Sequence, residues 1–159
     1  MAKNLSCNFS ALRQATRRVT QLYDQALAPV NLRATQYSLL SQIEQLGPIA
    51  INPLAEAMVM DRATLGHNLR PLEDRGLVRL AVGLDRRSRE VHITQAGRNL
   101  LLEAQKLWRK AQDSFERTIG KVQAAALRAT HKELAASDFM LVSRVLKIRN
   151  EAFAATSAK

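Results

Sequence analysis

The stretch DRATLGHNLRPLEDRGLV, residues 61–78, decides the fold of this chain. Asp61 offers a side-chain oxygen where the first free amides of a helix need an acceptor. Leucines then recur at helical spacing and mark one buried face, at Leu65, Leu69 and Leu72. We therefore expect a helix from Ala63 to Arg75, which Gly76 ends in a left-handed conformation.

A shorter apolar helix is predicted just before this stretch, over Pro53 to Met60. Its apolar positions Leu54, Ala57 and Met58 follow one side of a helix. Two short helices in tandem, the second with a polar outer face, are typical of a helix-turn-helix.

The polar side chains of the second helix suit contacts with DNA. Arg70 matches the acceptor pair of guanine and Asn68 matches the edge of adenine in the major groove, with His67 as a third candidate for base contact. Arg62 and Thr64, at the start of the helix, are placed to hold phosphates.

Two short strands with a basic loop follow the second helix. The strands are expected over Leu77–Val82 and Glu90–Thr94 because aliphatic residues alternate there. The loop between them contains Asp85, Arg86, Arg87, Ser88 and Arg89. A solvated turn would explain a single arginine but explains the triplet poorly, so we assign Arg86, Arg87 and Arg89 to a DNA minor groove.

The segment 61–78, the Asp-Arg-Arg-Ser loop and the junction Ile93–Gly97 resemble the MarR family of bacterial transcriptional regulators. The resemblance covers nearly the whole chain. It implies a triangular homodimer in which each subunit carries one winged helix-turn-helix and the chain ends interlock. Gly66 and Pro71, within the second helix, depart from common members, so no base preference can be transferred.

Composition agrees with a nucleic-acid partner. The 159 residues carry a formal charge of +10, with a pI near 10.6, which favours a polyanion. A membrane surface and RNA compete on charge alone. No stretch approaches the length of a spanning helix and no signal-peptide core follows the first residues, so we expect a cytoplasmic protein without membrane attachment. The single cysteine excludes an internal disulfide framework.

Helices are expected on both sides of the DNA module. They cover Phe9–Ala28, a segment capped by Thr35 and ending at Leu46, Gln95–Ile119, and Val122–Ile148, with a hinge at Gly120. Residues 50 and 51 are expected to extend the wing sheet. The predicted fold is mainly α with a small β wing, in which residues 35–97 bind DNA and residues 1–34 and 98–159 form the dimer. A monomeric core is the alternative reading of the apolar stripes.

Two regulatory readings remain open. Cys7 precedes the first helix, where the helix dipole favours a thiolate. In the peroxide-sensing members of the family that this chain resembles, a cysteine near this place is hydrogen-bonded to a tyrosine of the dimer partner, which makes Tyr23 and Tyr37 candidates. A small buried hydrophobe is the other reading of Cys7.

The second regulatory reading is a small aromatic or apolar effector. Its candidate pocket combines the two tyrosines with Phe9, Met58, Met60 and Trp108. Aromatic and methionine side chains at helical spacing also occur as plain core.

Enzymatic activity finds no support in the sequence. The histidines His67, His92 and His131 lack metal-ligand spacing, no phosphate-cradling loop is present, and Ser88 has no adjacent general base. We expect no cofactor and no metal. The prediction is a dimeric repressor that binds a pseudo-palindromic operator, and a structural protein that binds DNA without sequence preference is the alternative.

Overall fold

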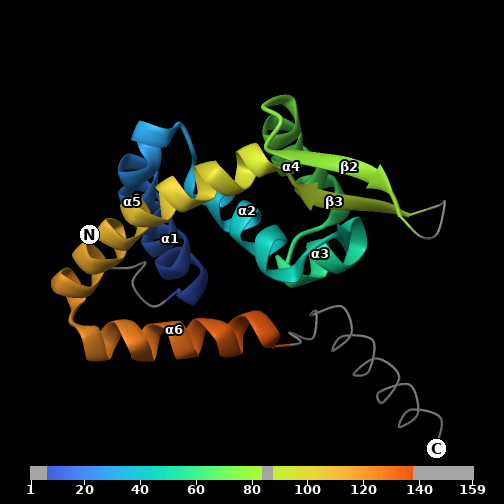
Figure 1. The fold of residues 1–159 in the computed structure, drawn as a ribbon. Coiled ribbons are helices and arrows are strands. Elements are labelled where there is room, and N and C mark those ends of the chain that lie inside the picture. The colour runs from blue at the N-terminus through green and yellow to red at the C-terminus, as the bar shows by residue number, and fades with distance from the viewer. Residues whose placement is uncertain (1–6, 84–87, 138–159) are drawn as a thin grey trace, which may run out of the picture. The chain divides into compact units, whose positions relative to one another are not determined.

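The computed structural model describes residues 7–83 and 88–137 (Figure 1). Two compact units divide the chain, Met1–Gly120 and Lys121–Lys159. The first unit contains the following elements: α1 (Asn8–Leu27), η1 (Ala28–Val30), α2 (Ala34–Leu46), β1 (Ile49–Ala50), α3 (Ile51–Ala57), α4 (Arg62–Asp74), β2 (Val78–Val82), β3 (Arg89–Ile93) and α5 (Gln95–Ile119). The expectation of a mainly helical chain with a small β wing is confirmed.

The first two helices meet at a tight corner. Pro29 lies in the short 3-10 helix η1, and Asn31 closes it with a left-handed backbone at φ 52°, a conformation that asparagine tolerates well. The expectation that Thr35 caps α2 is wrong. Arg33 is the capping residue, and the first amide of α2 is satisfied from the preceding helix, because the Asp24 carboxylate accepts from the backbone N–H of Ala34 at 2.7 Å.

The helix-turn-helix forms in the predicted region, but α3 begins at Ile51 and ends at Ala57, two residues before the expected start at Pro53 and three before the expected end at Met60. α3 and α4 pack on each other, and α4 packs on α2. The core of this region contains fully buried side chains: Leu39, Leu40, Ile43, Leu54, Leu65 and Leu72. Gly76 has a left-handed backbone, at φ 66°, just after α4. The leucine stripe of α4 therefore points into the core and leaves its opposite face to solvent.

The three strands form one antiparallel sheet in the order β1-β3-β2. Extended structure was expected at residues 50 and 51, and β1 lies one residue earlier, because Ile51 already begins α3. Val91 and Val78 are buried against the helices, and Arg79 faces His92 across β2 and β3. Since side chains alternate along a strand, Arg79 and His92 lie on the opposite face of the sheet. Figure 1 shows β2 and β3 as the hairpin that projects from the helices.

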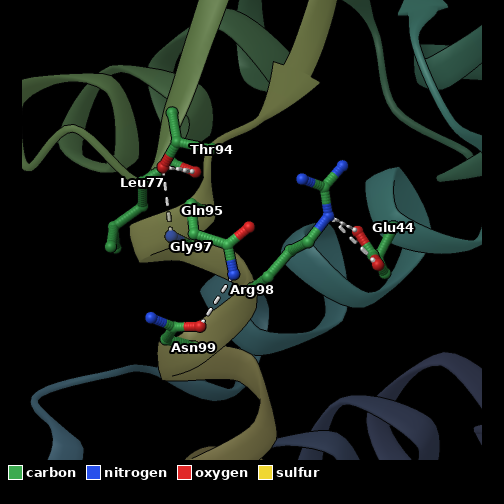
Figure 2. A network of polar contacts seen from close by, with 7 residues as sticks. All are labelled: Glu44, Leu77, Thr94, Gln95, Gly97, Arg98 and Asn99. Carbon is green, nitrogen blue, oxygen red and sulfur yellow. Dashed lines mark hydrogen bonds and ion pairs between the residues drawn. The ribbon is translucent and has the colours of Figure 1, made fainter.

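A polar joint connects the end of α4, the sheet and α5 (Figure 2). The Thr94 hydroxyl donates to the carbonyl of Gly76 at 2.7 Å and accepts from the Gly97 N–H at 3.1 Å, while the Thr94 N–H donates to Leu77 at 3.0 Å. Gly97 is buried against this joint. A β-carbon there would collide with the Leu77 carbonyl and lie 2.8 Å from Ile93, so only glycine permits the close approach.

The second unit contains α6 (Lys121–Ala136), which follows Gly120 as the sequence predicted. The remainder of the helix expected to reach Ile148 lies outside the described residues. The described helix α6 exposes three large apolar side chains, Val122, Leu127 and Leu134. No helix in residues 7–83 and 88–137 is both long enough and apolar enough to cross a membrane.

We predict opposite effects for alanine at two glycines. Gly97→Ala should lower the free energy of unfolding by about 1–3 kcal/mol, because the collision is with backbone and has no flexible side chain to yield. Gly66→Ala is the matched control, since a β-carbon at this exposed site in α4 meets nothing within 4 Å. It should raise the stability by about 0.5–1 kcal/mol through helix propensity. Chemical denaturation of both variants and wild type at one protein concentration measures the free energies of unfolding. A Gly97→Ala protein as stable as wild type contradicts the close-packing argument.

Candidate nucleic-acid interface

The start of α4 is capped by Asp61. Its carboxylate accepts from the Thr64 N–H at 2.8 Å and from the Thr64 hydroxyl at 2.6 Å. These bonds favour the charged carboxylate and lower the pKa of Asp61, the hydroxyl contributing most. The cap fixes the first turn, but it also engages the hydroxyl proton that Thr64 would need for donating to a phosphate.

The outer face of α4 carries the predicted contact residues. Arg62, Gly66 and Arg70 follow one another at intervals of four, and Ala63 and His67 lie beside them. All five are exposed, and neither arginine forms an ion pair with a residue that the structure describes. Because Gly66 lies in the middle of this face and has no side chain, the helix backbone is accessible between two arginines.

Asn68 lies at the border of the same face and is half-buried. Its amide nitrogen donates to the sulfur of Met60, the last residue before the cap, at 3.8 Å. This contact uses one of its amide hydrogens, so the second hydrogen and the carbonyl oxygen remain for a base edge. Sequence reasoning placed Met60 in an effector pocket, whereas the structure places it beside Asn68.

The wing contributes Arg89, which begins β3 and is exposed. Ser88 fixes the base of the loop, because its carbonyl accepts from the Gly83 N–H at 2.9 Å. Asp85, Arg86 and Arg87 lie outside the described residues, so the predicted roles of these two arginines remain predictions.

Aromatic side chains meet between α1, α2 and α5. Tyr37 stacks on Trp108 with ring centroids 5.9 Å apart, and Tyr23 is tilted against the same indole at 6.2 Å. The Tyr23 hydroxyl donates to Gln112 at 2.5 Å. Burial raises the pKa of Tyr37, and the charge of Arg109 opposes that shift.

A cavity of about 170 Å³ opens at this aromatic group, and we call it the Trp108 cavity. Residues that sequence reasoning did not select complete its lining: Val19, Thr20, Ala34 and Ser38. For Val19, Thr20 and Ala34, a spacing of three or four residues from Tyr23 or Tyr37 was the available signal, whereas Ser38 directly follows Tyr37 and no such spacing points to it. Phe9 and Met58 do not line it. Phe9 is 65% exposed with the Arg13 guanidinium over its ring, and Met58 packs against the helix-turn-helix core.

Cys7 is exposed and precedes the first turn of α1. The backbone amide and then the hydroxyl of Ser10 stabilise its thiolate and lower the pKa of the Cys7 thiol below its usual range. Tyr23 lies sixteen residues further along the same helix, a rise of roughly 24 Å. A hydrogen bond between these two side chains therefore requires two different subunits.

No group of three or more acidic, histidine or cysteine side chains in the described ranges is placed to hold a metal ion. The three histidines occupy separate elements, His67 on α4, His92 on β3 and His131 on α6. His92 pairs with Glu90 at 3.5 Å.

Known proteins share both sequence and fold with this chain. The sequence pattern of the MarR family matches residues 32–80. The M. tuberculosis transcriptional regulator MosR, solved in complex with DNA, is 31% identical with a TM-score of 0.71, and the match covers 84% of this chain and 100% of that one. The repressor CouR from Rhodococcus jostii RHA1, bound to a 23-mer DNA duplex, is 28% identical with a TM-score of 0.77, covering 85% and 97%.

A third solved structure, a MarR-family regulator from Rhodococcus sp. RHA1, is 26% identical with a TM-score of 0.73 and covers 87% of this chain and 100% of its own. These proteins are all described as transcriptional regulators. With its helix-turn-helix, its wing and a 31% identical relative matched over its full length, this chain belongs to the MarR family of transcriptional regulators.

Proposed function

We propose that this protein is a homodimeric repressor that binds a pseudo-palindromic DNA operator near its own gene. The observation that carries the proposal is the outer face of α4, which presents Arg62, His67 and Arg70 to solvent while its leucines are buried. Arg70, Asn68 and His67 would read bases, and Arg62 and Thr64 would hold phosphates. Arg86, Arg87 and Arg89 would enter the minor groove. For Thr64, a phosphate must compete with Asp61 for the hydroxyl proton.

Exposed apolar side chains support a dimer. Phe9 and Leu12 on α1 are 65% and 41% exposed, and α6 exposes a further set of aliphatic residues. Large apolar residues on one helix face gain free energy when a second subunit covers them. Two copies of α4 related by a two-fold axis would then face two half-sites about one helical turn of DNA apart.

Release from DNA is proposed to follow occupation of the Trp108 cavity by a small aromatic or apolar molecule. A cavity of about 150 Å³ already accepts one benzene ring, so the 170 Å³ here suits a single ring. The cavity also lies near the end of α4, the recognition helix of the helix-turn-helix. Arg75, just after α4, donates to the carbonyl of Asn31 at 2.7 Å, and Asn31 lies in the corner between α1 and α2. A ligand that binds one arrangement of this corner better than another shifts the population of DNA-binding states.

Oxidation of Cys7 is a second proposed signal, supported by its exposure and lowered thiol pKa. The thiolate would attack an organic peroxide, so that a sulfur–oxygen bond forms as the oxygen–oxygen bond breaks. The sulfur becomes a sulfenic acid, and the peroxide leaves as an alkoxide that takes a proton from water. As the only cysteine of the chain, Cys7 can form a disulfide only with a thiol from another molecule.

Base reading by Arg70 is tested with a DNA panel that varies each operator position. Arg70→Ala should lose about 1–3 kcal/mol on the preferred sequence and relax preference at one base pair. Arg89→Ala should instead weaken binding to all sequences alike and reduce the salt slope by about 0.9, as loss of one phosphate contact does. Gel shift with excess competitor DNA measures both. If excess competitor DNA abolishes binding of the wild-type protein to the operator, the protein is the non-specific structural protein instead. If Arg70→Ala weakens binding equally on all sequences, Arg70 contacts the DNA backbone and not a base.

The Trp108 cavity is tested by tryptophan emission, because Trp108 is the only tryptophan of the chain. Among single-ring aromatic acids and phenols, at least one should change the emission with saturation and weaken operator binding over the same concentration range. Ala34→Leu places three extra carbons in the cavity and should abolish both responses while operator affinity in the absence of ligand stays within about twofold. An Ala34→Leu protein that still responds contradicts this location for the effector.

Cys7 is tested by its pH-dependent alkylation with iodoacetamide. The midpoint of the rate should lie below that of a free cysteine in a short unstructured peptide, and Ser10→Ala should move it upward, because the variant loses the hydroxyl that helps to stabilise the thiolate although it keeps the Ser10 backbone amide. In gel shift, cumene hydroperoxide should release DNA and a thiol reductant should restore binding, and Cys7→Ser should abolish this cycle. Peroxide-insensitive binding by wild type, or release that persists in Cys7→Ser, rejects Cys7 as the sensor.

A further inference from the structure

A second hollow lies away from the outer face of α4, where the wing sheet meets α5. It has a volume of about 510 Å³ and is bordered by the end of α2, the face of the sheet turned away from the core, and the first turn of α5. We call it the wing-base groove and define it by Glu44, Arg79, His92, Gln95 and Arg98. None of these residues belongs to the contact face described above.

Two guanidinium groups border the groove and have N–H donors that no described residue accepts. The guanidinium of Arg79, on β2, makes no hydrogen bond or ion pair with any residue that the structure describes. Arg98 uses its Nε to donate to both oxygens of Glu44, at 3.1 and 3.3 Å, and Figure 2 shows its two terminal nitrogens directed away from that carboxylate. Planar guanidinium forks of this kind bind phosphate and carboxylate with two parallel hydrogen bonds.

Backbone amides at the start of α5 add to these donors. The Thr94 hydroxyl satisfies the N–H of Gly97, whereas the N–H groups of Gln95 and Ala96 have no protein acceptor in the described part of the chain. These amides carry the positive end of the helix dipole. The groove therefore contains hydrogen-bond donors from both β2 and α5. The polar joint around Thr94 fixes these two elements relative to each other.

The charge balance of the groove is positive. Arg79 and Arg98 contribute two positive charges against the single carboxylate of Glu44. Glu90, on β3, does not line the groove, and its carboxylate lies 3.5 Å from the Nε2 of His92. A dianion that accepts several hydrogen bonds suits this balance better than a monoanion does.

We propose that the wing-base groove binds a phosphate group between Arg79 and the free edge of Arg98. The phosphate has two possible sources, a small phosphorylated molecule or the backbone of DNA that extends beyond the operator half-site. Only the second source rests on the proposed function. In either case the bound phosphate ties the wing to α5.

The first arm of the test titrates inorganic phosphate into the full-length protein without DNA, at constant ionic strength maintained with chloride. Backbone amide signals of Gln95 and Ala96 in nitrogen-15 spectra report binding. Arg79→Gln should weaken the affinity about tenfold, because it removes a charge-assisted pair of hydrogen bonds to the phosphate and breaks no side-chain hydrogen bond or ion pair within the described residues. Arg98→Lys should weaken it through loss of the planar fork.

Two further variants give the arm its controls. Glu44→Gln should bind phosphate more tightly than wild type, because it removes the repelling carboxylate and frees the Nε of Arg98. Arg17→Gln, an exposed arginine on α1, lowers the net charge equally and should leave the affinity unchanged. An unspecific response to charge would affect Arg17→Gln and Arg79→Gln alike and would overturn the proposal.

The second arm measures the salt dependence of DNA binding with a long duplex and with one trimmed to the operator. If DNA supplies the phosphate, Arg79→Gln reduces the salt slope by about 0.9 on the long duplex, relative to Arg17→Gln, and has no such effect on the trimmed one. Saturable phosphate binding in the first arm together with an unchanged salt slope on the long duplex assigns the site to a small phosphorylated ligand. Failure of both arms overturns the site. If the wild-type protein binds phosphate but shows no sequence-specific DNA binding, the phosphate site stands and the proposed function is rejected.

Discussion

The joint between Thr94, Leu77 and Gly97 is the contact on which the rest of the first unit depends. It brings together the carbonyls that follow α4, the end of β3 and the first turn of α5 within hydrogen-bond distance. A side chain at position 97 would collide with the Leu77 backbone and with Ile93, so this joint would have to shift. Because α5 also packs along α1 and α2, this one joint sets the position of the recognition helix relative to the helices expected to form the dimer.

The same arrangement explains how a distant event could alter DNA binding. The corner between α1 and α2 is held at two places, by Arg75 on the Asn31 carbonyl and by Asp24 on the first amide of α2. The Trp108 cavity includes Ala34, the residue whose amide Asp24 binds. A molecule in the cavity would thus contact Ala34, three residues from the Asn31 carbonyl that binds Arg75, a short physical path for the proposed coupling.

Local sequence patterns predicted most of the fold. α5 has the bounds expected for it, Gln95–Ile119, and Asp61, Gly76 and Gly120 act as the helix boundaries that the sequence indicated. The error at the start of α2 is instructive. Thr35 has the residue type of a cap, but Asp24 from the preceding helix takes over that task, and a carboxylate ten residues away is not part of any local pattern.

For the candidate site, sequence periodicity alone determined which side chains of α4 are exposed, because leucines at helical spacing leave only one polar face. The tertiary structure decided which side chains meet. Tyr23, Tyr37 and Trp108 come from three helices and form one cavity, whereas Phe9, Met58 and Met60 lie elsewhere. The wing-base groove has the same origin, since Glu44, Arg79 and Arg98 are far apart in the chain. The spacing of residues along a helix fixes a face, but contact between elements depends on how their faces pack, and that is decided by the whole core.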